Sequence, residues 1–257
     1  MIAFLILLLV FCGSTAFPID IDTIFDRSQE ISQPENLQGS FTMTLTSRTG
    51  DTRTVKVDAY QKKVSEARED RLFLFTFPPS VKGTGLLVNS YLNEEEDLMW
   101  IYLPAVGKVK RVNLSTSGGG YFMGSDFTYS DLISTSREEL EHELLGEESL
   151  DGEECYKIEV RGRTRNAQRK YGYSREIHYI RKSDFVLKRV LFFDMAGDLL
   201  KIFYIDEVAD LGGYKYPSRV RMENQQTGHK SEIVFTDLQA GVDIPDSYFT
   251  QRYLQSR

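Results

Sequence analysis

The segment from Gly118 to Leu132, GGGYFMGSDFTYSDL, has the residue types best suited to chemistry in this chain. Consecutive glycines can cradle a phosphate with their backbone N–H groups, and two carboxyl groups can share acid and base roles. These glycines, however, lack the spacing and the following lysine of a phosphate-binding loop. Asp126 and Asp131 have no base or metal ligand at a recognisable spacing beside them. A mechanical role for the segment is therefore the stronger prediction.

Other reactive side chains are isolated in the sequence. His142, His178 and His229 belong to no HExxH or Cys/His pattern, and the chain has no GxSxG motif. Cys155 has no histidine close to it in sequence, so we expect a buried, inert thiol. We predict no enzymatic activity, no cofactor and no metal site. The alternative is a catalytic site assembled from residues that are distant in sequence.

Basic residues are concentrated between Arg161 and Arg175, where RGRTRNAQRKYGYSR carries six of them and no acidic residue. The favoured interpretation is a solvated hairpin or loop. The alternative is a contact for anionic lipid headgroups or an acidic partner, to which Tyr171 and Tyr173 would contribute. The net charge of −7 argues against nucleic-acid binding as the main function.

Residues 1–16, MIAFLILLLVFCGSTA, are typical of a secretory signal peptide. An apolar run precedes small residues, and Ser14 and Ala16 fit the cleavage pattern, so the mature chain is expected to start at Phe17. The run is shorter than the ~20 residues that a permanent transmembrane helix needs. Cys12 allows a second interpretation, lipidation as in a lipoprotein signal, which we favour less than simple cleavage.

The first element after this segment is expected to be a short amphipathic helix. Ile21, Ile24 and Phe25 recur at helical spacing, and Asp20 is a suitable N-cap. Pro34 closes the segment.

Beyond Pro34 the apolar residues alternate with polar ones, as in strands with one buried and one wet face. Val55 and Val57 show this pattern, as do Val220 and Met222. Turn signals between such runs predict hairpins, and hence a locally connected antiparallel sheet of about ten to twelve strands. These signals are Thr49-Gly50-Asp51, Asp151-Gly152, Ala196-Gly197-Asp198 and Thr227-Gly228.

Four runs are apolar on both faces: RLFLFTF (71–77), LMWIYLP (98–104), VLFFDM (190–195) and LLKIFYI (199–205). An antiparallel strand needs this only when its second face is also covered. Because few helices are predicted, a strongly curved sheet around an apolar cavity is one interpretation, and a sandwich of two packed sheets is the other. A membrane-spanning barrel is disfavoured because charges interrupt almost every run.

Four segments resemble, in chain order, the LolA-like family of outer-membrane lipoprotein-sorting proteins, which is related to the periplasmic lipoprotein carrier. They are FTFPPSVKGTGLLV (75–88), WIYLPAVGKVKRV (100–112), FMGSDFTYSDL (122–132) and IPDSYFTQRYL (244–254). The GSDF[ST]YxDL string in the third segment is the most specific of them. The resemblance implies that residues 17–257 form one mainly β, α+β domain: a half-open antiparallel β-barrel, or curved sheet, wrapped around short helices.

The resemblance also implies a non-enzymatic periplasmic carrier that holds the acyl chains of a lipid or lipoprotein in an apolar cavity for transfer toward the outer membrane. Its partners would be a membrane lipid exporter or an outer-membrane acceptor. Covering each methylene gains ~0.8 kcal/mol, so such a cavity suffices without catalysis. The rival hypothesis is a periplasmic sensor or adaptor that binds a protein partner with the same barrel.

The predicted cavity lining consists of aromatic and leucine side chains from the strands. It comprises Phe73, Phe75, Phe77, Leu87, Trp100, Tyr102, Leu103, Phe192 and Phe203. Replacing Trp100 with alanine is accordingly expected to weaken binding of an acyl probe.

The GSDF segment is predicted to be a hinge and lid over the barrel mouth. Residues 118–120 would form a pliable approach, and Ser125 or Asp126 would cap the following turn. The predicted lid residues are Phe122, Gly124, Ser125, Asp126, Phe127, Asp131 and Leu132.

Overall fold

The computed structural model of the protein describes residues 19–93, 96–114 and 120–256. The predicted signal peptide, including Cys12, lies outside these ranges, as do Phe17 and residues 118–119 of the predicted pliable approach. Within the described ranges, no helix combines the length and the apolar character needed to cross a membrane.

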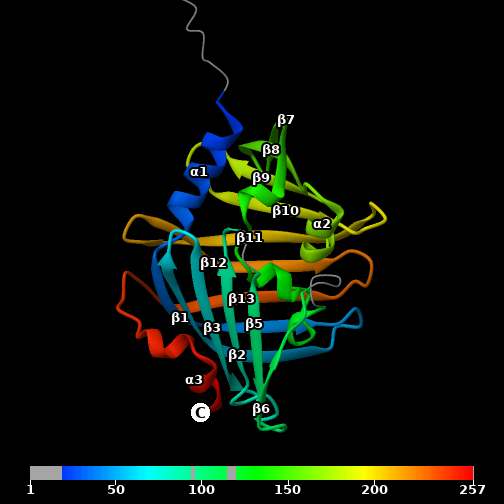
Figure 1. The fold of residues 1–257 in the computed structure, drawn as a ribbon. Helices are drawn as coiled ribbons and strands as arrows, with labels where there is room; N and C mark the ends of the chain where they lie inside the picture. Colours follow the sequence, from blue (N-terminus) through cyan, green and yellow to red (C-terminus); the bar gives the residue numbers. More distant parts are fainter. Residues whose placement is uncertain (1–18, 94–95, 115–119, 257) are drawn as a thin grey trace, which may run out of the picture.

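Within the described ranges, thirteen strands form one antiparallel sheet (Figure 1). Its order is β6-β5-β4-β3-β2-β1-β13-β12-β11-β10-β9-β8-β7. Neighbouring strands are therefore consecutive in the chain, except that β1 also pairs with β13. The strands are β1 (Asn36–Thr46), β2 (Thr52–Ser65), β3 (Arg68–Phe77), β4 (Gly85–Tyr91), β5 (Leu98–Leu103), β6 (Lys108–Arg111), β7 (Leu140–Leu150), β8 (Glu153–Gly162), β9 (Arg175–Arg181), β10 (Leu187–Phe193), β11 (Leu199–Leu211), β12 (Tyr214–Asn224) and β13 (Lys230–Ala240).

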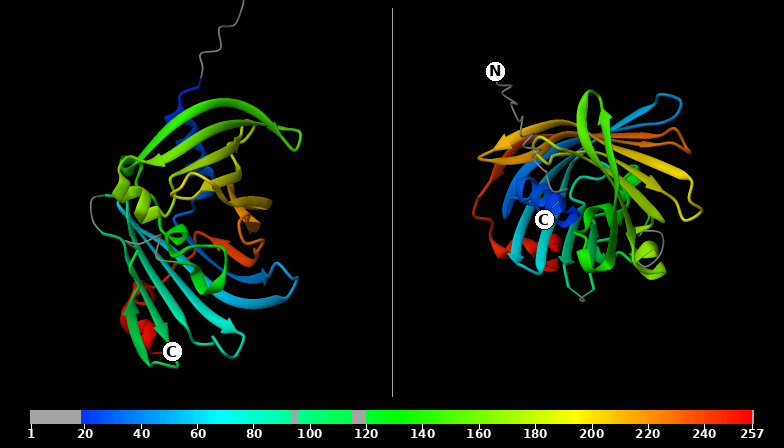
Figure 2. Two further views of the ribbon diagram at one scale, coloured as in Figure 1. Left: turned by 90° about the vertical axis from the view of Figure 1, so that its right-hand side faces the viewer. Right: turned by 90° about the horizontal axis from the view of Figure 1, so that it is seen from above.

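The consecutive strands β6 and β7 lie at opposite edges of this sheet, so the chain between them has to cross from one edge to the other. The described part of the crossing segment contains the GSDF motif and three short 3₁₀ turns, η2 (Phe122–Gly124), η3 (Tyr129–Leu132) and η4 (Arg137–Glu139). The sheet is strongly curved, and the green crossing segment lies within its curve (Figure 2). The motif therefore spans the open side of an unclosed barrel.

The helices are few and short. Helix α1 (Ile21–Ser32) lies inside the curve, where Ile24 packs against Ile158 of β8 and Ile180 of β9. Helix α2 (Arg165–Tyr171) connects β8 to β9. After β13, the turn η5 (Asp246–Phe249) and helix α3 (Gln251–Gln255) pack on the outside of β3, β4 and β5.

The alternation of β3 shows why several strands are apolar on both faces. Phe73 and Phe75 contribute to the main core on the concave side, together with Phe122 of the crossing segment. Leu72 and Leu74 point the other way and pack with the C-terminal segment around α3. The second face of these strands is thus covered by the chain's own C-terminal segment rather than by a second sheet.

The structure confirms the predicted mainly β, half-open antiparallel fold, and the sandwich alternative is wrong. The N-terminal helix is confirmed with Asp20 at its N-cap position, although the Asp20 side chain makes no capping hydrogen bond. All four predicted turns connect consecutive antiparallel strands. The sheet has slightly more strands than the ten to twelve expected from turn signals.

Candidate functional site

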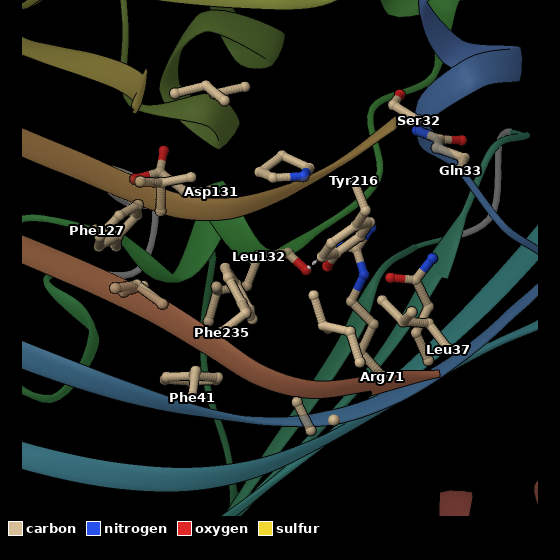
Figure 3. Close-up of a pocket in the computed structure, with 18 of the residues that line it drawn as sticks. Ser32, Gln33, Leu37, Phe41, Arg71, Phe127, Asp131, Leu132, Tyr216 and Phe235 are labelled. Carbon is tan, nitrogen blue, oxygen red and sulfur yellow. Dashed lines mark hydrogen bonds between the residues drawn. The ribbon is translucent and has the colours of Figure 1, made fainter. Parts of the chain in front are cut away.

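The concave side of the sheet contains an apolar pocket of about 360 Å³ (Figure 3). It lies between the C-terminal end of α1, the crossing segment, and the strands on either side of the β1–β13 pairing. Its lining comprises Ser32, Gln33, Leu37, Gly39, Phe41, Ala59, Tyr60, Gln61, Arg71, Phe73, Phe122, Phe127, Asp131, Leu132, Val186, Leu187, Phe203, Ile205, Lys215, Tyr216, Pro217, Val220, Ile233, Phe235 and Leu238.

Aromatic side chains from four strands form the centre of the pocket wall. Phe41 of β1 and Phe235 of β13 are directly opposite each other in the sheet register, and their ring centroids are 5.5 Å apart. Phe73 meets the other side of Phe41 at 6.2 Å, and Tyr216 meets Phe235 at 5.7 Å. All three contacts are edge-to-face, which is a favourable geometry for aromatic pairs. Burial raises the pKa of Tyr216 to about 12, so its hydroxyl stays neutral at ordinary pH.

The charged groups of the pocket wall are paired with other groups of the protein. The Arg71 guanidinium donates to the carbonyl oxygen of Leu132 at 2.7 Å and forms an ion pair with Glu69 at 2.5 Å. Arg71 thereby connects β3 to the end of the GSDF motif. The Asp131 carboxylate forms an ion pair with a lysine of the sheet.

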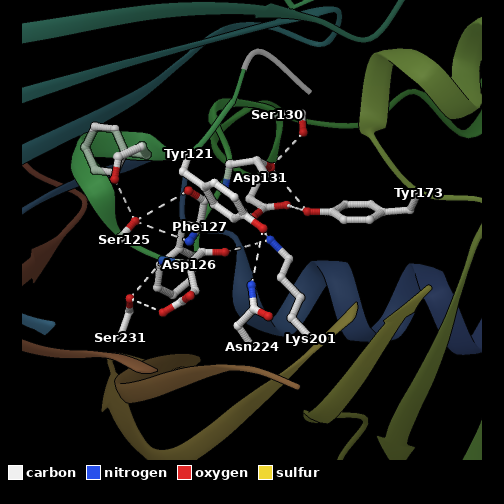
Figure 4. A network of polar contacts seen from close by, with 12 residues as sticks. Tyr121, Ser125, Asp126, Phe127, Ser130, Asp131, Tyr173, Lys201, Asn224 and Ser231 are labelled. Atoms are coloured by element: carbon white, nitrogen blue, oxygen red, sulfur yellow. Dashed lines mark hydrogen bonds and ion pairs between the residues drawn. The ribbon is translucent and has the colours of Figure 1, made fainter. Parts of the chain in front are cut away.

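That lysine is Lys201 of β11, whose side chain is fully buried. Its Nζ donates to Asp131 Oδ2 at 2.7 Å and to the carbonyl oxygen of Asp126 at 2.8 Å (Figure 4). It also lies over the rings of Tyr173 and Phe192, at 5.1 and 5.2 Å from their centroids. A buried ammonium group is tolerated only when it is paired and hydrogen-bonded, and this environment provides both.

Asp131 has further partners. Its Oδ1 accepts a hydrogen bond from the Tyr173 hydroxyl at 2.6 Å, and its Oδ2 accepts one from the backbone N–H of Thr128 at 2.7 Å. Burial, together with the adjacent Asp131 carboxylate, raises the pKa of Tyr173 well above its ordinary value. Tyr173 therefore remains a hydrogen-bond donor to the carboxylate.

Asp126 anchors the motif to β13 at a second point. Its Oδ2 accepts hydrogen bonds from Ser231 Oγ at 2.7 Å and contacts His229 Nδ1 at 2.6 Å. The Asp126 backbone N–H donates to the same Ser231 oxygen at 2.8 Å. Ser125 acts locally, as its Oγ accepts from the Phe127 N–H and donates to the Phe122 carbonyl. Neither Ser125 nor Asp126 caps the following turn, which corrects the prediction: Thr128 is the N-cap of η3, and Asp126 makes long-range contacts instead.

The two aspartates therefore fasten the crossing segment to the sheet. We call this group of residues (Asp126, Asp131, Tyr173, Lys201 and Ser231) the motif latch. Its polar atoms are paired with one another, which is the arrangement of a structural fastening. Among the described residues, no group of three or more His, Cys, Asp or Glu side chains could hold a metal ion.

Known proteins share this architecture. A family model described as "Uncharacterized protein" matches residues 67–256. A DUF1329 family protein from Desulfovibrio piger is 26% identical, with 91% of this chain and 98% of that chain covered and a TM-score of 0.84. An outer membrane lipoprotein-sorting protein domain from Vibrio parahaemolyticus is 25% identical, with 91% and 97% covered and a TM-score of 0.84. A LolA superfamily protein from Nitrosomonas europaea has the same fold, at 21% identity, 91% and 99% coverage and a TM-score of 0.71. The chain belongs to the LolA-like family. No curated protein matches its sequence.

Four of the cavity residues predicted for this LolA-like chain lie on the concave side. Phe73 and Phe203 line the pocket. Phe75 and Phe192 are buried in the core beside it, Phe75 against Phe122 and Phe192 against Tyr173. Of the predicted lid residues, those that line the pocket are Phe122, Phe127, Asp131 and Leu132, whereas Gly124, Ser125 and Asp126 do not. Movement of the segment as a hinge and lid stays a prediction.

The other predicted cavity residues are elsewhere, which corrects their assignment. Leu87, Trp100 and Tyr102 face outward and pack with the C-terminal segment. Phe77 lies at the end of β3 with 45% of its surface exposed, and Leu103 is a half-buried residue of β5 outside the pocket lining. For Leu87, Trp100 and Tyr102 the physical reason is the two-residue period of a strand, because each outward residue alternates with an equally apolar inward one. Phe77 and Leu103 are instead the last residues of β3 and β5, beyond the pocket.

The outward position of Trp100 reverses the expectation for its replacement. Trp100→Ala should leave the affinity for a fluorescent fatty acid unchanged, because the indole does not line the pocket. It should lower the free energy of unfolding by about 2 kcal/mol, because a half-buried aromatic side chain is lost. Phe73→Ala is the matched variant on the inward face and should weaken probe binding. Equal effects of the two substitutions on affinity would contradict this assignment of faces.

The basic stretch also differs from the favoured prediction. Instead of a hairpin or loop it contains helix α2, with Thr164 as N-cap and Gly172, at φ 87°, as C-cap. Tyr171 and Tyr173 are buried, so they are unavailable to lipid headgroups at the surface. Cys155 is buried as predicted, and burial raises the pKa of its thiol.

Sequence reasoning missed most of the pocket wall and the cation of the latch. Phe41, Tyr216 and Phe235 come from β1, β12 and β13, and none of them belongs to the four runs that are apolar on both faces. Lys201 did have a signal, since it is the single charged residue in the apolar run LLKIFYI. A lysine in such a run either lies at a β-bulge or on an edge strand, or is buried and paired with an acidic residue.

Proposed function

We propose that this LolA-like protein is a non-enzymatic periplasmic carrier that binds the acyl chains of a lipid or lipoprotein in its concave pocket. In this role it shields the chains from water during transfer toward the outer membrane. The observation that carries the proposal is the pocket of about 360 Å³ with mainly aliphatic and aromatic walls. The name of the V. parahaemolyticus relative, an outer membrane lipoprotein-sorting protein domain, supports the same role.

The chemistry of the wall favours an acyl chain over a polar ligand. The aromatic rings around Phe41 offer faces and edges to methylene groups, and each methylene covered gains ~0.8 kcal/mol. The polar atoms of Arg71 and Asp131 are paired within the protein. The acyl chain would therefore contact mainly the apolar side chains of the wall. A predicted signal peptide in residues 1–16 supports a location outside the cytoplasm, where a lipid exporter and an outer-membrane acceptor would be the partners.

A chain-length series tests this proposal. Saturated fatty acids from octanoate to tetradecanoate should displace a fluorescent fatty acid with affinities that rise with length. Each step of two methylenes is worth ~1.6 kcal/mol, so the dissociation constant should fall by about 15-fold per step until the pocket is full. Mass spectrometry of solvent extracts should also detect lipid bound to the purified protein. Absence of bound lipid, together with no displacement at any chain length, would overturn the carrier proposal.

A further inference from the structure

Two turns of the sheet lie together at one end of the molecule. The turn between β3 and β4 (residues 78–84) and the turn between β5 and β6 (residues 104–107) are at the same end because β4 is antiparallel to both β3 and β5. They are in contact, since a Cβ placed on Gly83 would lie 3.2 Å from Cγ of Pro104. Figure 1 shows this end at the bottom, beyond the label of β6.

These turns expose large apolar side chains. Phe77 and Val106 each have 45% of their surface accessible, and Pro79 and Pro104 are exposed beside them. Most apolar side chains of this size in the described ranges are buried in the core clusters. Exposed apolar groups on neighbouring turns at one end of a molecule are typical of an interaction site.

The same end is positively charged in an otherwise acidic protein. Residues 71–93 and 98–114 contain no acidic residue, whereas the whole chain has a net charge of −7. Lys82, Lys108 and Lys110 are exposed around the turns, and no ion pair joins any of them to another described residue. We call Phe77, Lys82, Val106, Lys108 and Lys110 the β3–β6 tip.

We propose that the β3–β6 tip docks on the surface of a bilayer that contains anionic phospholipid. Apolar side chains flanked by lysines match the membrane interface, where the apolar groups enter the acyl boundary and the ammonium groups meet phosphate. A convex end with two apolar side chains is too small for a specific protein interface, which buries at least ~1,000 Å². A membrane contact needs neither that area nor a complementary shape.

This inference goes beyond the carrier function and does not depend on it. Strand β3 connects the two sites, because Phe73 lines the pocket and Phe77 belongs to the tip. Four residues of extended chain separate them by about 13 Å. Docking at the tip would therefore hold the pocket close to a membrane from which an acyl chain is taken or to which it is given.

Flotation with vesicles tests the proposal on the full mature chain. The protein should float with vesicles of phosphatidylcholine and phosphatidylglycerol, should not float with phosphatidylcholine alone, and should bind less at high salt. Lys82→Gln/Lys108→Gln/Lys110→Gln should weaken binding by about 100-fold, because each lysine near an anionic surface contributes roughly one factor of five. Phe77→Ser/Val106→Ser should also weaken it. Absence of flotation with the anionic vesicles would overturn the proposal.

Two matched variants establish that the tip, rather than charge or exposure in general, is responsible. Arg163→Gln/Arg165→Gln/Arg169→Gln removes the same charge from the other basic stretch, and Met195→Ser removes an apolar side chain that is also 45% exposed. Both should bind vesicles like the parent protein, and losses equal to those of the tip variants would overturn the assignment. Tip variants should retain affinity for the fatty-acid probe, so failure of docking and failure of the carrier proposal are separable.

Discussion

Replacing Lys201 with methionine should lower the free energy of unfolding by about 3–5 kcal/mol. The ammonium group is fully buried and is the only cation in ion-pair contact with Asp131 among the described residues. Its removal leaves the Asp131 carboxylate in the core without a counter-charge, and the carbonyl of Asp126 loses a donor. Urea unfolding monitored by circular dichroism measures the loss.

Two control variants distinguish the loss of stability caused by an unpaired buried charge from that caused by the loss of an ordinary surface ion pair. Lys215→Met removes a half-buried lysine that pairs with the exposed Asp210 at 2.6 Å, and such surface pairs contribute at most about 1 kcal/mol. Lys201→Met/Asp131→Leu removes both buried charges and should recover part of the lost stability, because no unpaired charge remains. If Lys201→Met unfolded at the same urea concentration as Lys215→Met, the motif latch would not be a major source of stability.

The latch also explains how a half-open barrel keeps its shape. The sheet has two free edges, at β6 and β7, and the crossing segment is the covalent connection between them. Lys201 and Ser231 fasten the middle of that segment to β11 and β13 in the centre of the sheet, while Arg71 fastens Leu132, the last residue of the motif, to β3. Amide hydrogen exchange of residues 121–132 should therefore be slow in the parent protein and faster in Lys201→Met.

The strands were predictable from the sequence because their apolar period and their turn chemistry are local. Val55 and Val57 are buried on one face, and Gly50 and Gly152 have the positive φ values that their hairpin turns require. The fold class followed from these features and from the GSDF resemblance.

The inward face was not predictable for the strands that are apolar on both sides. In β3, Leu72 and Phe73 are equally suitable for a cavity, and only the packing of the C-terminal segment against Leu72 decides between them. Trp100 was misplaced for the same reason. That decision depends on residues more than 140 positions away in the chain, which no local pattern encodes.

The pocket and the latch were likewise hidden because they join distant parts of the chain. Phe41 meets Phe235 through the pairing of the first strand with the last. Lys201 and Asp131 are separated by 70 residues, so their ion pair has no signature in either segment alone. The sequence marks each partner as unusual, a lysine in an apolar run and an aspartate in an aromatic one, but it does not pair them.

Introducing an acid at the centre of the pocket should abolish most ligand binding. Phe235→Asp removes a ring that contacts both Phe41 and Tyr216 and places a carboxylate beside the acyl chain. Loss of the aromatic contact costs about 1.5–3 kcal/mol, and desolvation of the carboxylate adds to it. The dissociation constant for a fluorescent fatty acid should therefore rise by at least about 100-fold. Because Phe235 is half-buried, the sheet should tolerate the change better than it would in the closed core.

The matched control is Phe193→Asp, which makes the same substitution at a half-buried aromatic residue of the outer cluster around Cys155. It should lower stability without changing the affinity for the probe, because Phe193 does not line the pocket. Ala59→Trp provides an independent test without a charge, since it fills the pocket from β2 and should shorten the longest fatty acid that still binds. If Phe235→Asp and Phe193→Asp reduced affinity equally, the concave pocket would not be the acyl site. If Ala59→Trp also left the chain-length limit unchanged, the ligand would have to bind elsewhere on the protein.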